Sequence, residues 1–320
     1  MNGFAHVMSQ VLVAVVQVAA VAVGGPLLLG LMRKVRCRLE GRVGAPFHQP
    51  LLDLRKLFVK QRMRPRESSW VFGAGPVILV ATAVAVVAVS PLATTRPPLG
   101  QSSDFFAVVF VLLLGSVLLA LSALDTGTAF GGMGSSRSMT IGALCEPALL
   151  VAILAMAIPA RTSNLPALVR IGLHHPSVIA SPARILALAS FLVVILAESG
   201  RLPVDNPSTH LELTMIHEAM VLEYSGPDLG YIILGESMRL VFLLGLLVNL
   251  LVPWGVADRP GALAFCVGLL ALGIKVVAAG VAIALFEVFT AKMRLFRLPE
   301  LLAGGFVLAL LGAVTAVVAR

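Results

Sequence analysis

Eight long apolar stretches are the feature of this sequence that most limits its fold. Each approaches or exceeds the roughly 20 residues that a helix needs to cross the hydrocarbon core of a bilayer. Hydrophobic residues make up 58% of the chain and charged residues only 12%, outside the usual range of soluble domains. We therefore expect an all-α, polytopic membrane protein with about eight transmembrane helices in one domain, 1–320. The predicted spans are 5–32, 71–92, 104–124, 139–160, 182–199, 230–253, 262–286 and 299–319.

Other kinds of membrane segment fit the pattern less well. The strands of a transmembrane barrel alternate apolar and polar residues over about ten positions, and the sequence has no such segments. The first stretch is too long for a signal peptide and has no basic region before it, so we expect it to be retained, with the mature chain starting at Met1. The sequence has no internal repeat of the kind found in many secondary transporters.

The basic residues predict the orientation of the chain. A basic loop, 33–70, carries 11 of the 24 Lys and Arg residues, and the odd-numbered loops together carry sixteen against six in the even-numbered loops and at the C-terminus. Because cytoplasmic loops are enriched in Lys and Arg, we expect the odd-numbered loops to be cytoplasmic and both termini to lie outside the cytoplasmic membrane. The net charge of +8 is then a topology signal, so we expect no nucleic-acid partner.

Two of the predicted cytoplasmic loops have distinct patterns. In the first loop, apolar and charged residues alternate over 50–60, which predicts an interfacial helix touching the bilayer. The acidic loop, 200–229, follows the fifth span, and the segment from Glu198 to Gly226 holds five of the sixteen acidic residues. A second short helix is expected over about 210–223. Its apolar residues suggest that a partner covers it, although solvated acids remain the simpler interpretation.

The residue types that usually bind metals or catalyse bond breakage are poorly placed in this chain. Cys37, Cys145 and Cys266 lie in separate segments, whereas an iron–sulfur cluster typically takes four thiolates. His210 and His217 are seven residues apart, which does not match the spacing of a helical metal site. We therefore expect this chain to have no catalytic, cofactor-binding or metal-binding residues of its own.

Charged residues inside the predicted spans are costly in hydrocarbon, so they should face the bundle interior or water. Glu236 and Arg239 are three residues apart and could form a local ion pair, which leaves a structural and a functional interpretation equally open. Glu146 and Lys275 have no obvious local partner. Each could load and release a proton, because burial shifts the pKa of a carboxylate or an amine toward neutrality.

Four segments in the same order resemble the membrane subunit shared by respiratory complex I, there called subunit 1 or H, and the group 4 [NiFe] hydrogenases. They are "RVGAPFHQPLLDLRKLFVK", "GSSRSMTIGAL", "ESGRLPVDNP…HLELTMIHEAMVLEYSG" and "AKMRLFRLPELL". The third segment is similar to the formate hydrogenlyase branch. Val204 replaces the phenylalanine of the "PFD" pattern of complex I, a change that affects nothing essential to the resemblance. Complex I usually has a shorter acid-rich stretch before "EYSG", and this departure from its acid cluster counts against a quinone tunnel.

The resemblance implies a complex I subunit 1-like fold and a role in coupling rather than bond breakage. Such a subunit docks a hydrophilic redox arm and links electron transfer to proton or sodium translocation. The implied partners are hydrogenase large and small subunits, an iron–sulfur subunit and antiporter-like membrane subunits, which would carry the [4Fe-4S] clusters and the [NiFe] centre. The alternatives are the quinone-site subunit of a respiratory NADH dehydrogenase and, more distantly, a secondary ion transporter.

Two sets of residues receive roles from this resemblance together with the charge pattern. The expected arm-docking residues are Arg42, Gly44, Gln49, Pro50, Arg55, Arg201 and Asp205. The expected proton-path residues are Glu146, Glu198, Glu212, Glu218, Glu223, Lys275 and Glu287.

Overall fold

The computed structural model describes residues 2–98, 100–175, 181–201, 204–205, 215–259, 261–291 and 297–318. In these ranges the regular structure is helical, apart from two isolated β-bridges. This confirms the predicted all-α fold. The elements are α1 (Asn2–Leu39), α2 (Gln49–Val59), α3 (Trp70–Val89), η1 (Gly100–Ser102), α4 (Phe105–Leu124), α5 (Ala129–Ala160), α6 (Leu165–His174), α8 (Pro182–Glu198), α9 (His217–Val221), α10 (Gly226–Leu251), α11 (Ala262–Phe289) and α12 (Leu298–Val318).

Seven of these helices are long and apolar enough to cross a membrane: α1, α3, α4, α5, α10, α11 and α12. The fifth predicted span corresponds to α8, which has 17 residues and lies at the short end of the range for a transmembrane helix. Part of the predicted helix at 210–223 is present as the shorter α9, and residues 206–214 lie outside the described ranges.

The largest difference in a helix boundary concerns α5. The sequence predicts a span that begins at residue 139, whereas α5 begins at Ala129, where the Thr128 hydroxyl accepts a hydrogen bond from the backbone N–H of Gly131. Hydropathy reports which residues cross the bilayer and carries no signal for a helix that continues beyond it. Arg137, predicted to lie in a loop, is therefore helical, and its guanidinium donates to the carbonyl of Met215.

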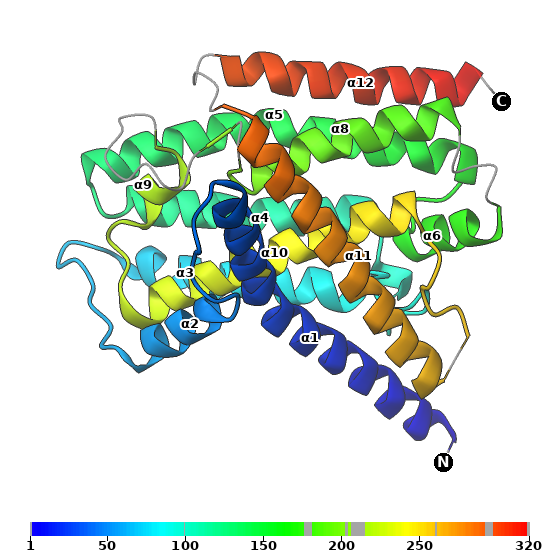
Figure 1. Ribbon diagram of the computed structural model, residues 1–320, viewed down its shortest axis with the longest axis horizontal. Helices are drawn as coiled ribbons and strands as arrows, with labels where there is room; N and C mark the ends of the chain where they lie inside the picture. The colour runs from blue at the N-terminus through cyan, green and yellow to red at the C-terminus, as the bar shows by residue number, and fades with distance from the viewer. Residues whose placement is uncertain are drawn as a thin grey trace.

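The long helices alternate in direction and give the bundle two ends. The basic end comprises α2, α9, the connections 40–48, 60–69 and 125–128, and the described part of 199–225. The opposite end comprises α6 and the described parts of the connections 90–104, 161–181 and 252–261. Figure 1 shows the basic end on the left, and both chain termini on the right with the opposite end. The structure thus places the two termini on one side of the bundle, which is compatible with the predicted topology.

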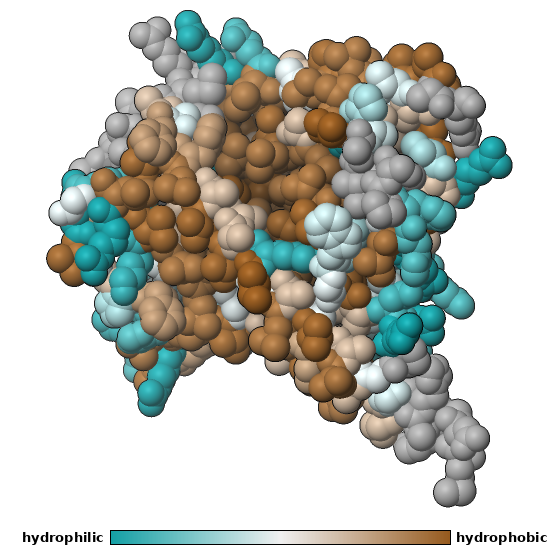
Figure 2. Space-filling view, turned by 45° about the vertical axis from the view of Figure 1, so that its right-hand side comes forward, coloured by the Kyte–Doolittle hydropathy of each residue, from teal (hydrophilic) through white to brown (hydrophobic). Residues whose placement is uncertain are grey.

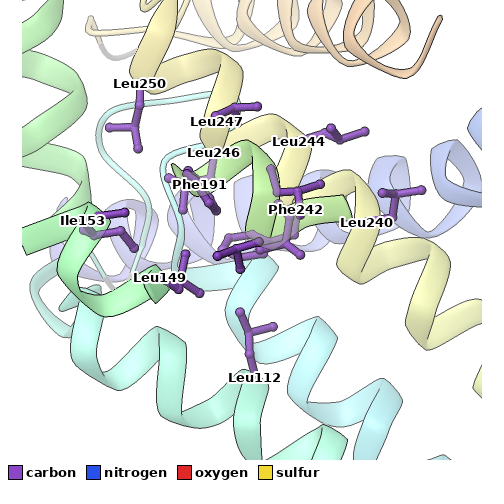
Figure 3. Packing of buried hydrophobic residues seen from close by; sticks show 14 of the residues in the cluster. Leu112, Leu149, Ile153, Phe191, Leu240, Phe242, Leu244, Leu246, Leu247 and Leu250 are labelled. Atoms are coloured by element: carbon purple, nitrogen blue, oxygen red, sulfur yellow. The ribbon is translucent and has the colours of Figure 1, made fainter. Parts of the chain in front are cut away.

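The centre of the bundle is α10, whose apolar window is 72% buried. Figure 3 shows Phe242 and Leu246 of α10 beside Phe191 of α8, and Leu149 and Ile153 of α5 and Leu112 of α4 belong to the same buried cluster. Helices in a membrane associate through close packing, because lipid tails are as apolar as the side chains themselves. At Gly25 of α1 a Cβ atom would lie 2.7 Å from the Ser237 hydroxyl, so glycine permits the close approach of α1 to α10.

Large apolar side chains remain exposed on the outer helices. On α11, Leu263, Leu270 and Ile274 are at least 69% exposed. Figure 2 shows hydrophobic residues covering the middle of one face, with hydrophilic residues gathered toward its left and right edges. An apolar belt bounded by two polar ends is the surface that a bilayer would cover.

Candidate functional site

A row of charged side chains enters the bundle from the basic end. Its first members are Arg201, which follows α8, and Glu287 of α11. Nη1 of Arg201 donates to Oε1 of Glu287 over 3.4 Å, and the two side chains are only 11% and 3% exposed. Nη1 of Arg36, on α1, lies 4.0 Å from the other Glu287 oxygen. Three separate segments of the chain therefore share one buried carboxylate.

Asp205 is the next member of the row. Its backbone N–H donates to the carbonyl of Arg201, so the two residues lie in one turn. Oδ2 of the buried Asp205 carboxylate accepts from the backbone N–H groups of Ile216 and His217, at 3.3 and 3.4 Å. Because a carboxylate accepting from the first N–H groups of a helix acts as a cap, Asp205 fixes the start of α9.

His217 connects α9 to α10. Its Nε2 atom lies 2.9 Å from Oε2 of Glu236. Burial by itself lowers the pKa of His217, but the nearby carboxylates, Glu236 foremost, outweigh this effect and raise the pKa to about 9. His217 is therefore a cation at neutral pH.

One turn further along α10, Arg239 joins α8 and α4. Nη2 donates to Oε2 of Glu198 over 2.7 Å, and Nη1 donates to the Ser116 hydroxyl over 2.5 Å. The local pair between Glu236 and Arg239 that their spacing permits does not form, because each residue pairs with a different helix. A buried charge needs several well-placed partners, and the neighbouring helices supply them better than a side chain of the same helix.

Glu146 of α5 lies at the inner end of the row. Its half-buried carboxylate interacts electrostatically with Glu198 and with Arg239. Along the row the charges alternate in sign until this point, where the Glu146 carboxylate lies within electrostatic range of the pair formed by Glu198 and Arg239. We call the whole set the charged row; its members are Arg36, Glu287, Arg201, Asp205, His217, Glu236, Arg239, Glu198 and Glu146.

Several predicted proton-path residues lie outside this row. Lys275 is on the other side of the bundle centre, where its Nζ donates to Oδ1 of Asn249 over 3.3 Å and to the carbonyl of Val252 over 2.6 Å. Glu218 is half-buried on α9, and Glu223 is exposed at the basic end. Glu212 lies outside the described residues.

The predicted docking residues of the first loop divide into exposed and structural positions. Arg42 and Arg55 are exposed at the basic end, as is Gly44, which adopts a φ of 66°. Pro50 is buried in the first turn of α2, and the Gln49 amide donates to Asp53 one turn further on, over 2.9 Å. Gln49 and Pro50 therefore shape the beginning of this helix, and the two arginines remain available to a partner.

Sequence reasoning missed a second anchor, which joins the first loop to α10. Asp228, in the first turn of α10, has no exposed area, and Oδ1 lies 2.8 Å from Nη2 of Arg62. The hydroxyl of Ser225 accepts from the backbone N–H of Met63 over 3.3 Å. The available signal was the sequence Ser-Gly-Pro-Asp before an apolar run, since acids are favoured in the first turn of a helix.

Tyr224 strengthens the same anchor. Its ring stacks on Phe72 of α3 with centroids 4.1 Å apart, and its hydroxyl donates to the Phe72 carbonyl over 3.0 Å. Burial raises the pKa of Tyr224 to about 12, so the hydroxyl keeps its proton at neutral pH. The anchor therefore holds the first loop, α3 and α10 together at the basic end.

The fold and the charged row define a polytopic helical membrane protein with an ionisable interior. The chain belongs to the NADH dehydrogenase family, whose model matches residues 10–318. It is 31% identical over 305 residues to formate hydrogenlyase subunit 4 of Escherichia coli (strain K12), which covers 95% of this chain and 98% of that protein. Identity to hydrogenase-4 component C of the same strain is 29%, covering 94% of each chain.

The likeness to the H subunit of NADH-quinone oxidoreductase extends over less of the chain. The protein of Syntrophotalea carbinolica is 33% identical over 229 residues, which covers 66% of this chain and 67% of that protein. Among solved structures, a chain of the membrane-bound sulfane sulfur reductase, an archaeal respiratory membrane complex, matches with a TM-score of 0.83 and 20% identity. That match covers 96% of this chain and 99% of the other, and it shows a common fold.

Proposed function

We propose that this protein is the membrane subunit of a complex I-like [NiFe] hydrogenase of the formate hydrogenlyase type. The observation that carries the proposal is the 31% identity to formate hydrogenlyase subunit 4 over almost the full length of both chains. The match to the NADH-quinone oxidoreductase protein covers only two thirds of each chain. In this assignment the [4Fe-4S] clusters and the [NiFe] centre belong to partner subunits.

The basic end is the surface on which the redox arm would dock. The exposed guanidiniums of Arg42 and Arg55 would pair with carboxylates of the arm, and such rim contacts mainly set orientation and association rate. The anchor at Asp228 would hold the first loop in place beneath the arm. Arg201 and Asp205, which were also expected to dock the arm, are buried members of the charged row.

The charged row would transmit the effect of electron transfer into the bundle. A charge arriving near the basic end would bias the alternating ion pairs, because a buried charge interacts with its neighbours over a longer range than a solvated one. At the inner end one guanidinium faces the two carboxylates of Glu146 and Glu198, so a proton would complete the local charge balance. Loading and release of this proton would be the coupling step on this chain.

Isolation of the intact complex tests the proposal. An affinity tag on the full chain, expressed from its own locus, should co-purify a [NiFe] hydrogenase large subunit, a small subunit and antiporter-like membrane proteins, identified by mass spectrometry. Co-purification of NADH dehydrogenase subunits together with quinone-dependent turnover would favour the respiratory NADH dehydrogenase alternative. A chain that purifies alone and moves ions in liposomes would be a transporter, and the proposal would be wrong.

A further inference from the structure

A polar cavity of about 580 Å³ lies at the opposite end, far from the charged row. Its walls come from α1, from the connection between α3 and α4, and from the beginning of α6. Figure 1 shows α6 on the right, at the end of the bundle where α3 and α4 are connected. The volume lies within the roughly 300–1,000 Å³ range of small-molecule sites.

The residues around this cavity favour an anion. Two guanidiniums, Arg96 and Arg170, line it together with the amides of Gln10, Gln101 and Asn164. Among the described residues that form its wall, none is Asp or Glu. Guanidinium groups match the geometry of phosphate oxygens. The Asn164 amide donates to the Gly100 carbonyl and helps to shape the wall.

Arg170 is held in a fixed position. Its Nη2 donates to the carbonyl of Thr95 over 3.2 Å, and its Nε lies 3.3 Å from Oδ1 of Asp258. The Thr95 hydroxyl donates to the same carboxylate oxygen over 2.7 Å. Asp258 does not line this cavity, so it orients the guanidinium from outside it.

The depth of the cavity is set by the ends of three membrane-spanning helices. The α1 helix begins at Asn2, eight residues before Gln10. The α3 helix ends at Val89 and α4 begins at Phe105, so the connection that carries Arg96 runs between two span ends. This places Arg96 at the level of the lipid headgroups, and Arg170 lines the same cavity.

We infer that this cavity binds the phosphate of an anionic phospholipid headgroup in the leaflet at the opposite end. Basic residues at the membrane surface attract anionic lipids, and the guanidiniums of Arg96 and Arg170 would hold the phosphodiester in place. Inorganic phosphate shares this chemistry and is the other source to be distinguished. The inference concerns a site separate from the charged row and does not depend on the proposed function.

Lipid binding to the purified full chain tests the inference. Phosphatidylglycerol and phosphatidylcholine with identical acyl chains are titrated separately into the detergent-solubilised protein, and bound lipid is counted by native mass spectrometry. The wild type should prefer phosphatidylglycerol. R96Q should weaken its binding by about tenfold, as expected for loss of one charge-assisted contact. R259Q is the matched control, because Arg259 is exposed at the same end and lines a neighbouring cavity.

Three results would overturn the inference. The first is equal binding of the two lipids by the wild type. The second is an equal loss in R96Q and R259Q, which would indicate diffuse surface attraction. The third is stabilisation of the wild type, but not R96Q, by millimolar inorganic phosphate that also displaces phosphatidylglycerol, which would assign the site to free phosphate. Retention of the lipid in excess phosphate supports a headgroup site.

Discussion

The ion pair between Glu198 and Arg239 offers a direct test of the charged row. The two side chains are 14% and 13% exposed, and the pair joins α8 to α10 over 2.7 Å. The change Glu198→Gln keeps the size and one acceptor of the side chain but removes the charge that faces Arg239. The guanidinium then retains the Ser116 hydroxyl as its described neutral partner.

The expected effect follows from this geometry. Removing one partner of a buried ion pair costs about 3–5 kcal/mol, whereas a charge-assisted hydrogen bond contributes about 1.5–3 kcal/mol. Because glutamine still accepts a hydrogen bond, we expect Glu198→Gln to lower the free energy of unfolding by about 2 kcal/mol, and Glu198→Leu by about 4 kcal/mol. Glu223→Gln is the control, because it removes an exposed carboxylate at the basic end. It should change the free energy of unfolding by less than about 0.5 kcal/mol.

A double-mutant cycle with Arg239→Gln isolates the pair. Unfolding of the purified chain is followed in mixed detergent micelles for the wild type, the two single variants and the double variant. The second change should cost less once the first has been made, with a coupling energy of about 1–3 kcal/mol. If the single effects simply add within about 0.5 kcal/mol, the contact does not stabilise the fold and the argument for the row fails.

Four further predictions address coupling, pH, docking and topology. Glu146→Gln should leave the complex assembled but lower ion pumping per electron transferred; wild-type pumping at equal amounts of complex would exclude this residue from the path. Because the pKa of His217 is raised to about 9 from 6.5, its pairing should stabilise the fold fully below about pH 6.5 and be lost as the pH rises through 9. The stability difference between wild type and His217→Gln should follow that curve, and a difference independent of pH would contradict the assigned charge. Arg42→Glu combined with Arg55→Glu should reduce the peripheral subunits retained on washed membranes, and unchanged retention would remove the docking role. Reporter fusions should place the 33–66 loop in the cytoplasm, and a signal from the outer face of intact cells would reverse the topology.

Periodicity and hydropathy were sufficient to predict the helical fold. They were insufficient to predict which charged side chains pair inside the bundle. The sequence predicts the spans because an apolar run of about 20 residues is typical of a transmembrane helix and of few other structures. It also marks Glu146, Glu198 and Glu287 as buried charges, since acids are rare in such runs. All three lie in the charged row.

The partners of these charges could not be read from the sequence. The spacing along the helix would pair Glu236 with Arg239. In the bundle, the orientation of α10 instead pairs Glu236 with His217 and Arg239 with Glu198. Such contacts depend on which helix faces come together, and this is set by packing along the whole length of the bundle. Lys275 illustrates the same point. Its described contacts, with Asn249 and with the carbonyl of Val252, become apparent only when α11 is placed beside α10.

The anchor at Asp228 has a mechanical consequence. Asp228 lies eight residues before Glu236 on the same uninterrupted helix, a separation of about 12 Å at 1.5 Å per residue. An uninterrupted helix is stiff along its axis, so α10 connects the first loop rigidly to the inner ion pairs. A displacement of the first loop is therefore passed to the ionisable interior, unless the contacts of Arg62 with Asp228 and of Met63 with Ser225 break first.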